Sequence, residues 1–186
     1  MQRDRTRLIS PPYMSPLNQN TVSVIHAECL GRDINAVISV FSGGAWTANL
    51  CIYVPLLTAG SIVVSQFWWI NGGTVNGNTD IAIYSTDGAT RLIGTGATAN
   101  SGTNAVQAVN VTDAVLPSSS LLWLALGSDS GTQTYFRVAA SVQMLDFISI
   151  KQQAGGYSSG LPTPITLNTP TVAVLPWFGF TGAAVF

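Results

Sequence analysis

The strongest constraint on the fold is a rhythm of short apolar runs, each the length of a strand, between clusters of Gly, Asn, Asp and Ser. From Asn35 to Ile150 no apolar period of 3.6 residues continues for three turns, so long helices are not expected. Strands are predicted near 35–41, 48–54, 61–70, 79–85, 90–94, 104–111, 120–126 and 133–150. Strands of this number and spacing predict an all-β fold, an antiparallel β-sandwich of the jelly-roll kind.

Alternation within these runs predicts which faces are buried. In "ANLCIYV" (48–54) apolar residues alternate with Asn49, Cys51 and Tyr53, as in a half-buried strand. "LLWLAL" (121–126) is apolar on both faces and predicts a central strand that is covered on both sides. "TDG" (86–88) predicts a tight hairpin turn. In 133–150 the alternation changes phase, which predicts a bulge near 144–146.

Two segments flank the predicted sandwich domain of residues 35–150. Residues 1–34 contain "SPPYMSP" and predict an extended arm, because proline fixes φ and lacks an amide donor. Residues 151–186 form an apolar, proline-rich tail in which Lys151 is the last charged residue. An apolar tail in water favours aggregation, so it should pack on its own domain or, as the preferred hypothesis, on a neighbouring subunit.

Charged residues are scarce: 15 of the 186 residues are Asp, Glu, Lys or Arg, about 8% against roughly 25% in ordinary soluble domains. The net charge of −1 gives no case for binding nucleic acid. The sequence contains no run of 18 or more apolar residues, so it predicts no membrane-spanning helix. Its charged, proline-rich start does not resemble a signal peptide. The protein is therefore expected to be made and kept in a cytoplasm. The low charge fits either a secreted domain with a neutral Ser/Thr/Asn/Gly surface or a subunit whose surface is largely buried in an assembly.

Residues for catalysis or metal binding are not grouped in the sequence. His26 is the one histidine, and no carboxylate pair accompanies it. Four loop acids lack the spacing of a calcium loop, namely Asp80, Asp87, Asp113 and Asp129. Cys29 and Cys51 are expected to be reduced thiols. The sequence therefore predicts a non-enzymatic protein with no cofactor and no metal.

The doublet Trp68-Trp69 poses a packing problem, because adjacent side chains of a strand point to opposite faces. Simple alternation places Trp68 in the core and Phe67 with Trp69 on the other face, and a bulge before Trp68 would exchange these roles. The chain's own loops or tail, another subunit, or a bound ligand could cover the second face. The candidate interface residues are Phe67, Trp69, Trp177, Phe178, Phe180 and Phe186.

Three stretches in the middle of the chain carry a family resemblance: "ANLCIYVP", "FWWINGGTVNGNTDIAIYSTDGATRLIGTGAT" and "NAVQAVNVTDAVLPSSSLLWLALGSDS". Together they resemble a β-sandwich module of tailed-bacteriophage virion proteins, of the decoration, head-fibre and tail-associated types. The resemblance covers roughly residues 46–137. It departs from the family at "PSSSLLW", where residues 117–120 lack the usual turn glycine.

The resemblance implies a structural role in a virion, as a capsid decoration or cement protein or a head fibre. Arm and tail would bind neighbouring subunits, with a homotrimer and the major capsid protein as expected partners, after assembly in the host bacterial cytoplasm. The alternative is a tail-fibre or lectin-like module that binds glycans. Its sugar-stacking residues would be drawn from Trp46, Trp69 and Trp123.

Overall fold

The computed structural model describes residues 21–23, 43–58, 60–139 and 141–184. Within these ranges the strand pairings between named elements are antiparallel, and one short helix interrupts them. The predicted all-β class is confirmed.

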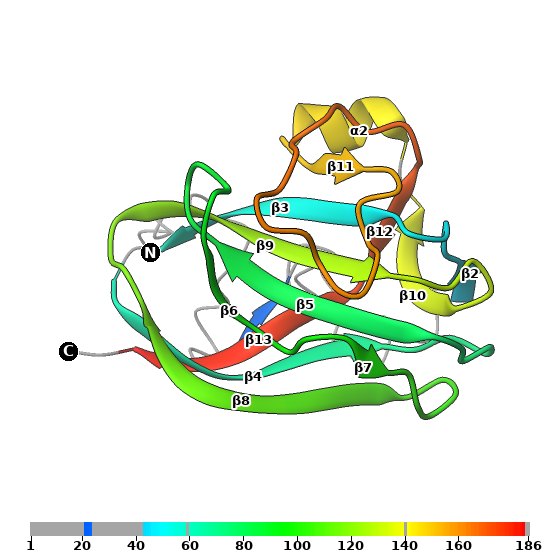
Figure 1. Cartoon of the computed structure of the whole chain (residues 1–186), viewed down its shortest axis with the longest axis horizontal. Helices are drawn as coiled ribbons and strands as arrows, with labels where there is room; N and C mark the ends of the chain where they lie inside the picture. Colours follow the sequence, from blue (N-terminus) through cyan, green and yellow to red (C-terminus); the bar gives the residue numbers. More distant parts are fainter. Residues whose placement is uncertain (1–20, 24–42, 59, 140, 185–186) are drawn as a thin grey trace, which may run out of the picture.

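The largest sheet has six strands and lies toward the viewer in Figure 1. Its order is β11-β3-β9-β5-β6, and β7 pairs with β5 beyond this path. The strands are β3 (Cys51–Thr58), β5 (Asn78–Tyr84), β6 (Arg91–Gly94), β7 (Thr98–Ala99), β9 (Ser120–Ser128) and β11 (Lys151–Gln153).

A second sheet has four strands in the order β1-β13-β4-β8, and a three-stranded sheet has the order β12-β10-β2. The four strands are β1 (Thr21–Ser23), β4 (Ile62–Ile70), β8 (Val106–Leu116) and β13 (Phe178–Ala184). The three are β2 (Gly43–Ala45), β10 (Thr134–Ala139) and β12 (Val174–Pro176). Helix α2 (Val142–Phe147) connects β10 to β11.

The main core takes alternate side chains from the two larger sheets. They are Ile52, Val54 and Leu56 of β3, Ile81 and Ile83 of β5, Leu122, Leu124 and Leu126 of β9, and Ile62, Val64, Phe67, Trp69, Phe178 and Phe180 of β4 and β13. The other face of β9 contributes Trp123 and Ala125 to a second buried cluster. The prediction of a central strand that is covered on both sides is confirmed.

A bulge in β4 decides the orientation of the tryptophan doublet. Thr181 of β13 pairs with Gln66 of β4, and the next residue, Gly182, pairs with Val64, so Ser65 is an extra residue in β4. Because of this extra residue, the side chains of Val64 before it and Phe67 after it both point into the core. Trp69 is therefore the core tryptophan, completely buried beside Phe178. Trp68 points to the opposite face between Gly179 and Ala108, and is 9% exposed. Trp69 thus takes the inward position that simple alternation assigned to Trp68, as expected for a bulge before Trp68, although both tryptophans are buried in the core cluster.

The predicted strand over 133–150 is wrong beyond Ala139. The chain forms α2 there, and the expected bulge at 144–146 lies inside this helix. Val142 and Leu145, three residues apart, are the more buried positions, whereas Gln143 and Asp146 are exposed. This spacing is that of a helix face, and it explains the apparent change of phase in the alternation.

The strand predicted over 48–54 begins later and continues further, as β3 from Cys51 to Thr58. Asn49 has a left-handed φ of 59° and precedes the strand. Pro55 is tolerated because β11 pairs only with residues 51–53, so β3 has no partner on that side at Pro55. The hairpin turn at 86–88 is confirmed: β5 pairs with β6, and Gly88 has a φ of 71°.

The described part of the tail packs on its own chain. It supplies β11, β12 and β13, and β13 lies between β1 and β4. The boundary at residue 150 therefore separates no independent segment, because both larger sheets contain tail strands. Of the predicted arm, β1 pairs with β13. The rest of the arm and the strand predicted at 35–41 lie outside the described residues.

Candidate interaction surface

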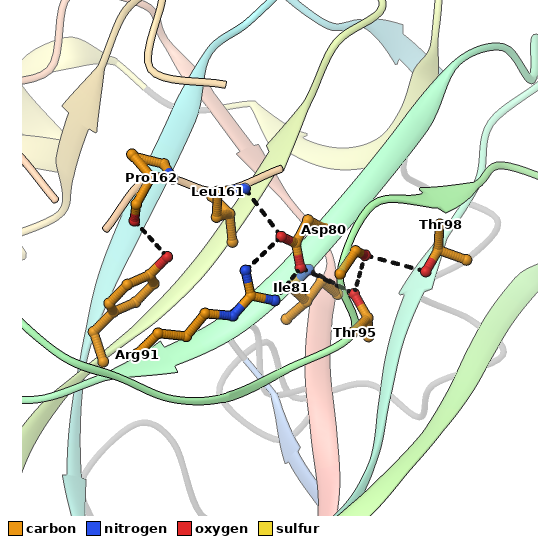
Figure 2. Close-up of polar contacts among 9 residues, drawn as sticks. Asp80, Ile81, Arg91, Thr95, Thr98, Leu161 and Pro162 are labelled. Atoms are coloured by element: carbon orange, nitrogen blue, oxygen red, sulfur yellow. Dashed lines mark hydrogen bonds and ion pairs between the residues drawn. The ribbon is translucent and has the colours of Figure 1, made fainter. Parts of the chain in front are cut away.

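A buried carboxylate, Asp80, joins three separate segments on the outer face of the six-stranded sheet (Figure 2). Its oxygens accept two hydrogen bonds from the Arg91 guanidinium, at 2.7 and 2.8 Å, and one from Thr95 Oγ1 at 3.1 Å. The Leu161 backbone amide donates a fourth at 2.9 Å. A buried charge is tolerated when it is paired and hydrogen-bonded in this way. Asp80 therefore ties β6 and the tail to β5.

Residues 154–168, called the strap below, cross the outer face of this sheet. Tyr157, Leu161 and Ile165 of the strap are buried in the second cluster against Tyr53 and Tyr84. The Tyr84 hydroxyl donates to the Pro162 carbonyl at 2.7 Å, and the Leu161 amide donates to Asp80. The strap is therefore held by both apolar burial and directed hydrogen bonds.

The close fit of the strap depends on Gly127 in β9. A Cβ at this position would lie 2.8 Å from Tyr157 Cδ2, 2.9 Å from Leu161 Cδ2 and 3.0 Å from Cys51 Sγ. A side chain at residue 127 would therefore force Tyr157 or Leu161 to shift, so glycine lets the strap approach β9 this closely.

Cys51 is a free, buried thiol beneath the strap. Burial raises the pKa of Cys51 to about 12. Because the thiolate is the reactive form, the thiol is inert at neutral pH and acts as a packing residue. Cys29 and His26 lie outside the described residues.

A second polar cluster joins the loops at one end of the two sheets. The buried Asn71 side chain accepts hydrogen bonds from Trp69 Nε1 and Gln133 Nε2, and donates to Ser101 O and Gln107 Oε1. Gln133 Oε1 in turn accepts from the Asn76 amide at 2.8 Å. The amide groups of Asn71 and Gln133 thus use their hydrogen-bonding capacity within the protein, which fixes the loops and leaves no group free for a ligand.

The loop acids considered as calcium ligands have separate structural roles. Asp80 pairs with Arg91, and Asp129 accepts two hydrogen bonds from Asn78, both at 2.7 Å. Asp87 accepts from Ser85 and Ala89 in its turn, and these bonds lower its pKa. Asp113 lies exposed in β8. In the described ranges no group of three or more His, Cys, Asp or Glu is placed to hold a metal ion.

The candidate interface residues are occupied within the chain. Phe67, Trp69, Trp177, Phe178 and Phe180 are at most 1% exposed, and Phe67 packs edge-on against Phe180 at 6.2 Å between ring centres. Phe186 lies outside the described residues. Of the three covers considered for Phe67 and Trp69, the structure shows the chain's own, so the five described candidates form no exposed contact surface.

The tryptophans considered for sugar stacking are also buried. Each indole nitrogen donates to an acceptor inside the chain, from Trp46 to Leu50 O, from Trp69 to Asn71 Oδ1 and from Trp123 to Thr86 O. None of the three is more than 8% exposed. These rings therefore form no platform on the surface of the described structure.

The surface offers exposed aliphatic side chains instead. Val115 is 64% exposed and Val106 57%, both on β8, while Leu57 and Leu121 face each other on β3 and β9. Sequence reasoning missed these residues because each lies in a run that reads as core. The Asp80–Arg91 pair was missed as a unit, although an Asp in an apolar strand and an Arg across its hairpin were visible signals.

No family model, no curated protein and no solved structure matches this chain. No described helix is long and apolar enough to span a membrane. The functional argument therefore depends on the residues themselves.

Proposed function

We propose that the chain is a non-enzymatic structural subunit of a bacteriophage virion, of the capsid decoration, cement or head-fibre type. In this proposal the two larger sheets form a β-sandwich of the jelly-roll type. Its partners would be further copies of itself and other virion proteins such as the major capsid protein, and assembly would take place in the host bacterial cytoplasm.

The supporting observation is how the few charges are used. Eight of the fifteen charged residues follow Asp33. Asp80 pairs with Arg91, and Asp146 pairs with Lys151 at 3.2 Å. The remaining surface combines small polar residues with exposed aliphatic ones such as Val106 and Val115. Because protein interfaces are depleted in Lys, Glu and Asp, such a surface suits contact with other subunits.

The proposal is tested on particles. Virions from a culture that carries the gene are banded by density and probed with antibodies raised against the purified chain. Co-sedimentation of the chain with intact particles is the expected result. Particles that lack the chain, while the free protein is abundant in the same lysate, would overturn the proposal.

Point substitutions are the right probe of the contact surface. Deleting residues 161–186 would remove β13 and part of the strap, so the domain itself would unfold. Val115→Asp and Leu121→Asp instead change exposed side chains and leave the core intact. Loss of incorporation in one variant, with an unchanged thermal melt, would identify the contact face.

A further inference from the structure

β8 is a long edge strand, and one of its edges pairs with no described strand. β8 ends the four-stranded sheet and pairs with β4 on one side. Figure 1 shows it along the lower border of the molecule. Within the described ranges, no backbone or side-chain group bonds to the other edge of Val106–Asn110. An edge of this kind is a template for another strand.

The edge lacks most of the devices that prevent pairing. Proteins protect edge strands with lysine, proline, bulges or short length. β8 has eleven residues, and Val106–Asn110 contains neither charge nor proline. Asp113 is its one charge, and it lies in an irregular stretch opposite Ser65, where the register with β4 shifts. The protection is thus confined to one half of the strand.

The straight half of β8 has defined limits. At one end β8 begins at Val106, and the preceding Ala105 carbonyl accepts the Asn71 amide at 2.9 Å as the last bond of the pairing with the β4 side. At the other end the pairing with β4 becomes irregular after Asn110. The stretch between these limits is Val106–Asn110, and its middle residue is Ala108.

We propose that β8 pairs with β8 of a second copy of this chain, antiparallel and about a two-fold axis at Ala108. This pairing sets Val106 opposite Asn110 and Gln107 opposite Val109, and it keeps the two Asp113 carboxylates apart. No like charges meet, so nothing in the edge disfavours its own copy, as an isologous contact requires. The four-stranded sheets of two subunits then form one continuous sheet, with the exposed Val106 side chains beside the junction.

The inference deepens the proposed virion role by naming one partner and the strand that binds it. It is tested on the purified full-length chain, separately from any particle. Sedimentation equilibrium over a range of concentrations is expected to show a monomer–dimer equilibrium. Ala108→Lys places two ammonium groups opposite each other and is expected to raise the dissociation constant at least about tenfold.

Leu121→Lys is the matched control, because Leu121 is 43% exposed on β9, whose two edges are both paired. This variant should dimerise like the unmodified chain. A second test uses Ala108→Cys in a Cys29→Ser background, where mild oxidation should give a disulfide-linked dimer. Opposed Cβ atoms of paired strands are about 4.5–5.5 Å apart, close enough for cross-linking after small movements. Leu121→Cys in the same background should remain monomeric on a denaturing gel.

Three results would overturn the inference: a monomer at every concentration, a dimer that Ala108→Lys leaves unchanged, or a dimer that Ala108→Cys fails to cross-link. If Ala108→Lys does not fold by circular dichroism, the cross-linking result decides. A monomer that still co-sediments with virions would overturn β8 pairing and leave the virion role standing. A β8-linked dimer that is absent from virions would do the reverse.

Discussion

The outer faces of the two larger sheets differ in how their apolar side chains are covered. On the six-stranded sheet, the strap covers Tyr53, Tyr84 and Cys51, and Asp80 anchors it. On the four-stranded sheet, Trp68 lies between Gly179 and Ala108, while Val106 and Val115 remain mostly exposed. One face therefore has its apolar side chains closed by the chain's own tail. On the other, Trp68 is buried but the aliphatic side chains of Val106 and Val115 are exposed.

The two outer faces also differ in the polar side chains that they carry. The Asp80–Arg91 pair belongs to the closed face, where it orders strap and strands. The outer side of the four-stranded sheet carries amides instead, with Gln66 Nε2 bonded to Asn110 Oδ1 at 2.7 Å. Charge fixes an internal contact on the closed face, whereas the described strands of the four-stranded sheet carry Asp113 as their one charge and are otherwise neutral, which suits contact with another protein surface.

The largest expected effect comes from removing the anchor of the closed face. Asp80→Ala leaves the Arg91 guanidinium without its carboxylate and should lower the free energy of unfolding by about 3 kcal/mol. Urea denaturation measures the loss, and exchange of the Leu161 amide should become faster. Asp87→Ala, at an exposed turn, should have a much smaller effect.

The double variant Asp80→Ala/Arg91→Met sharpens this result. If the cost of Asp80→Ala comes from the unpaired charge, removal of that charge should restore part of the lost stability. A urea midpoint of Asp80→Ala equal to that of the unmodified chain would show that apolar burial alone holds the strap.

A smaller effect on the closed face is expected when the free energy of unfolding is measured as a function of alkaline pH. Burial raises the pKa of Cys51 to about 12, whereas an unfolded thiol has a pKa of about 8.5. The folded state thus holds a proton that the unfolded state loses, so this contribution is complete below about pH 8.5 and is lost as pH rises toward 12. Between pH 8 and pH 10 it should reduce the free energy of unfolding by about 1–2 kcal/mol.

Cys51→Ala is the variant for this measurement. Its stability should fall less between pH 8 and pH 10 than that of the unmodified chain, in urea titrations at both pH values. In the native state at pH 8, Cys51 should also resist a thiol reagent until urea is added. Rapid labelling of Cys51 without urea would indicate that the strap opens readily.

The smallest expected effect concerns the turn that joins the open sheet to the closed one. Ser119, between β8 and β9, has a left-handed φ of 52° in the loop that lacks a glycine. Ser119→Gly should relieve this strain and raise the free energy of unfolding by about 0.5 kcal/mol. Thermal melts measure the change, with Ser118→Gly as the control that should not stabilise.

Local patterns predicted much of the fold. Turn residues placed the 86–88 hairpin, and apolar runs on both faces identified β9 as a central strand. The exact phase of β4 could not be obtained from alternation alone, because the extra residue at Ser65 is defined only by the pairing with β13. Helix α2 was misread because six residues are too few for a helical period to stand out from a bulge.

Candidate contact residues were harder to predict because burial depends on contacts distant in the sequence. The aromatic residues of "PWFGF" were predicted as candidate contacts with another subunit, yet Phe178 and Phe180 complete the core beside β4. Val106 and Val115 read as core, yet β8 is an edge strand with one open face. The order of strands in a sheet separates these cases, and a single sequence does not reveal that order.

The position of β13 also affects how the chain reaches its native state. The Ser65 hydroxyl and the Thr181 carbonyl, bonded between β4 and β13, are separated by 116 residues along the chain. At a synthesis rate of about 5–20 residues per second, roughly 6–23 seconds pass between the synthesis of Ser65 and that of Thr181. Until then Phe67 lacks its ring partner Phe180, and the β4 edge that pairs with β13 is open. Nascent chains should therefore need protection by a chaperone during translation.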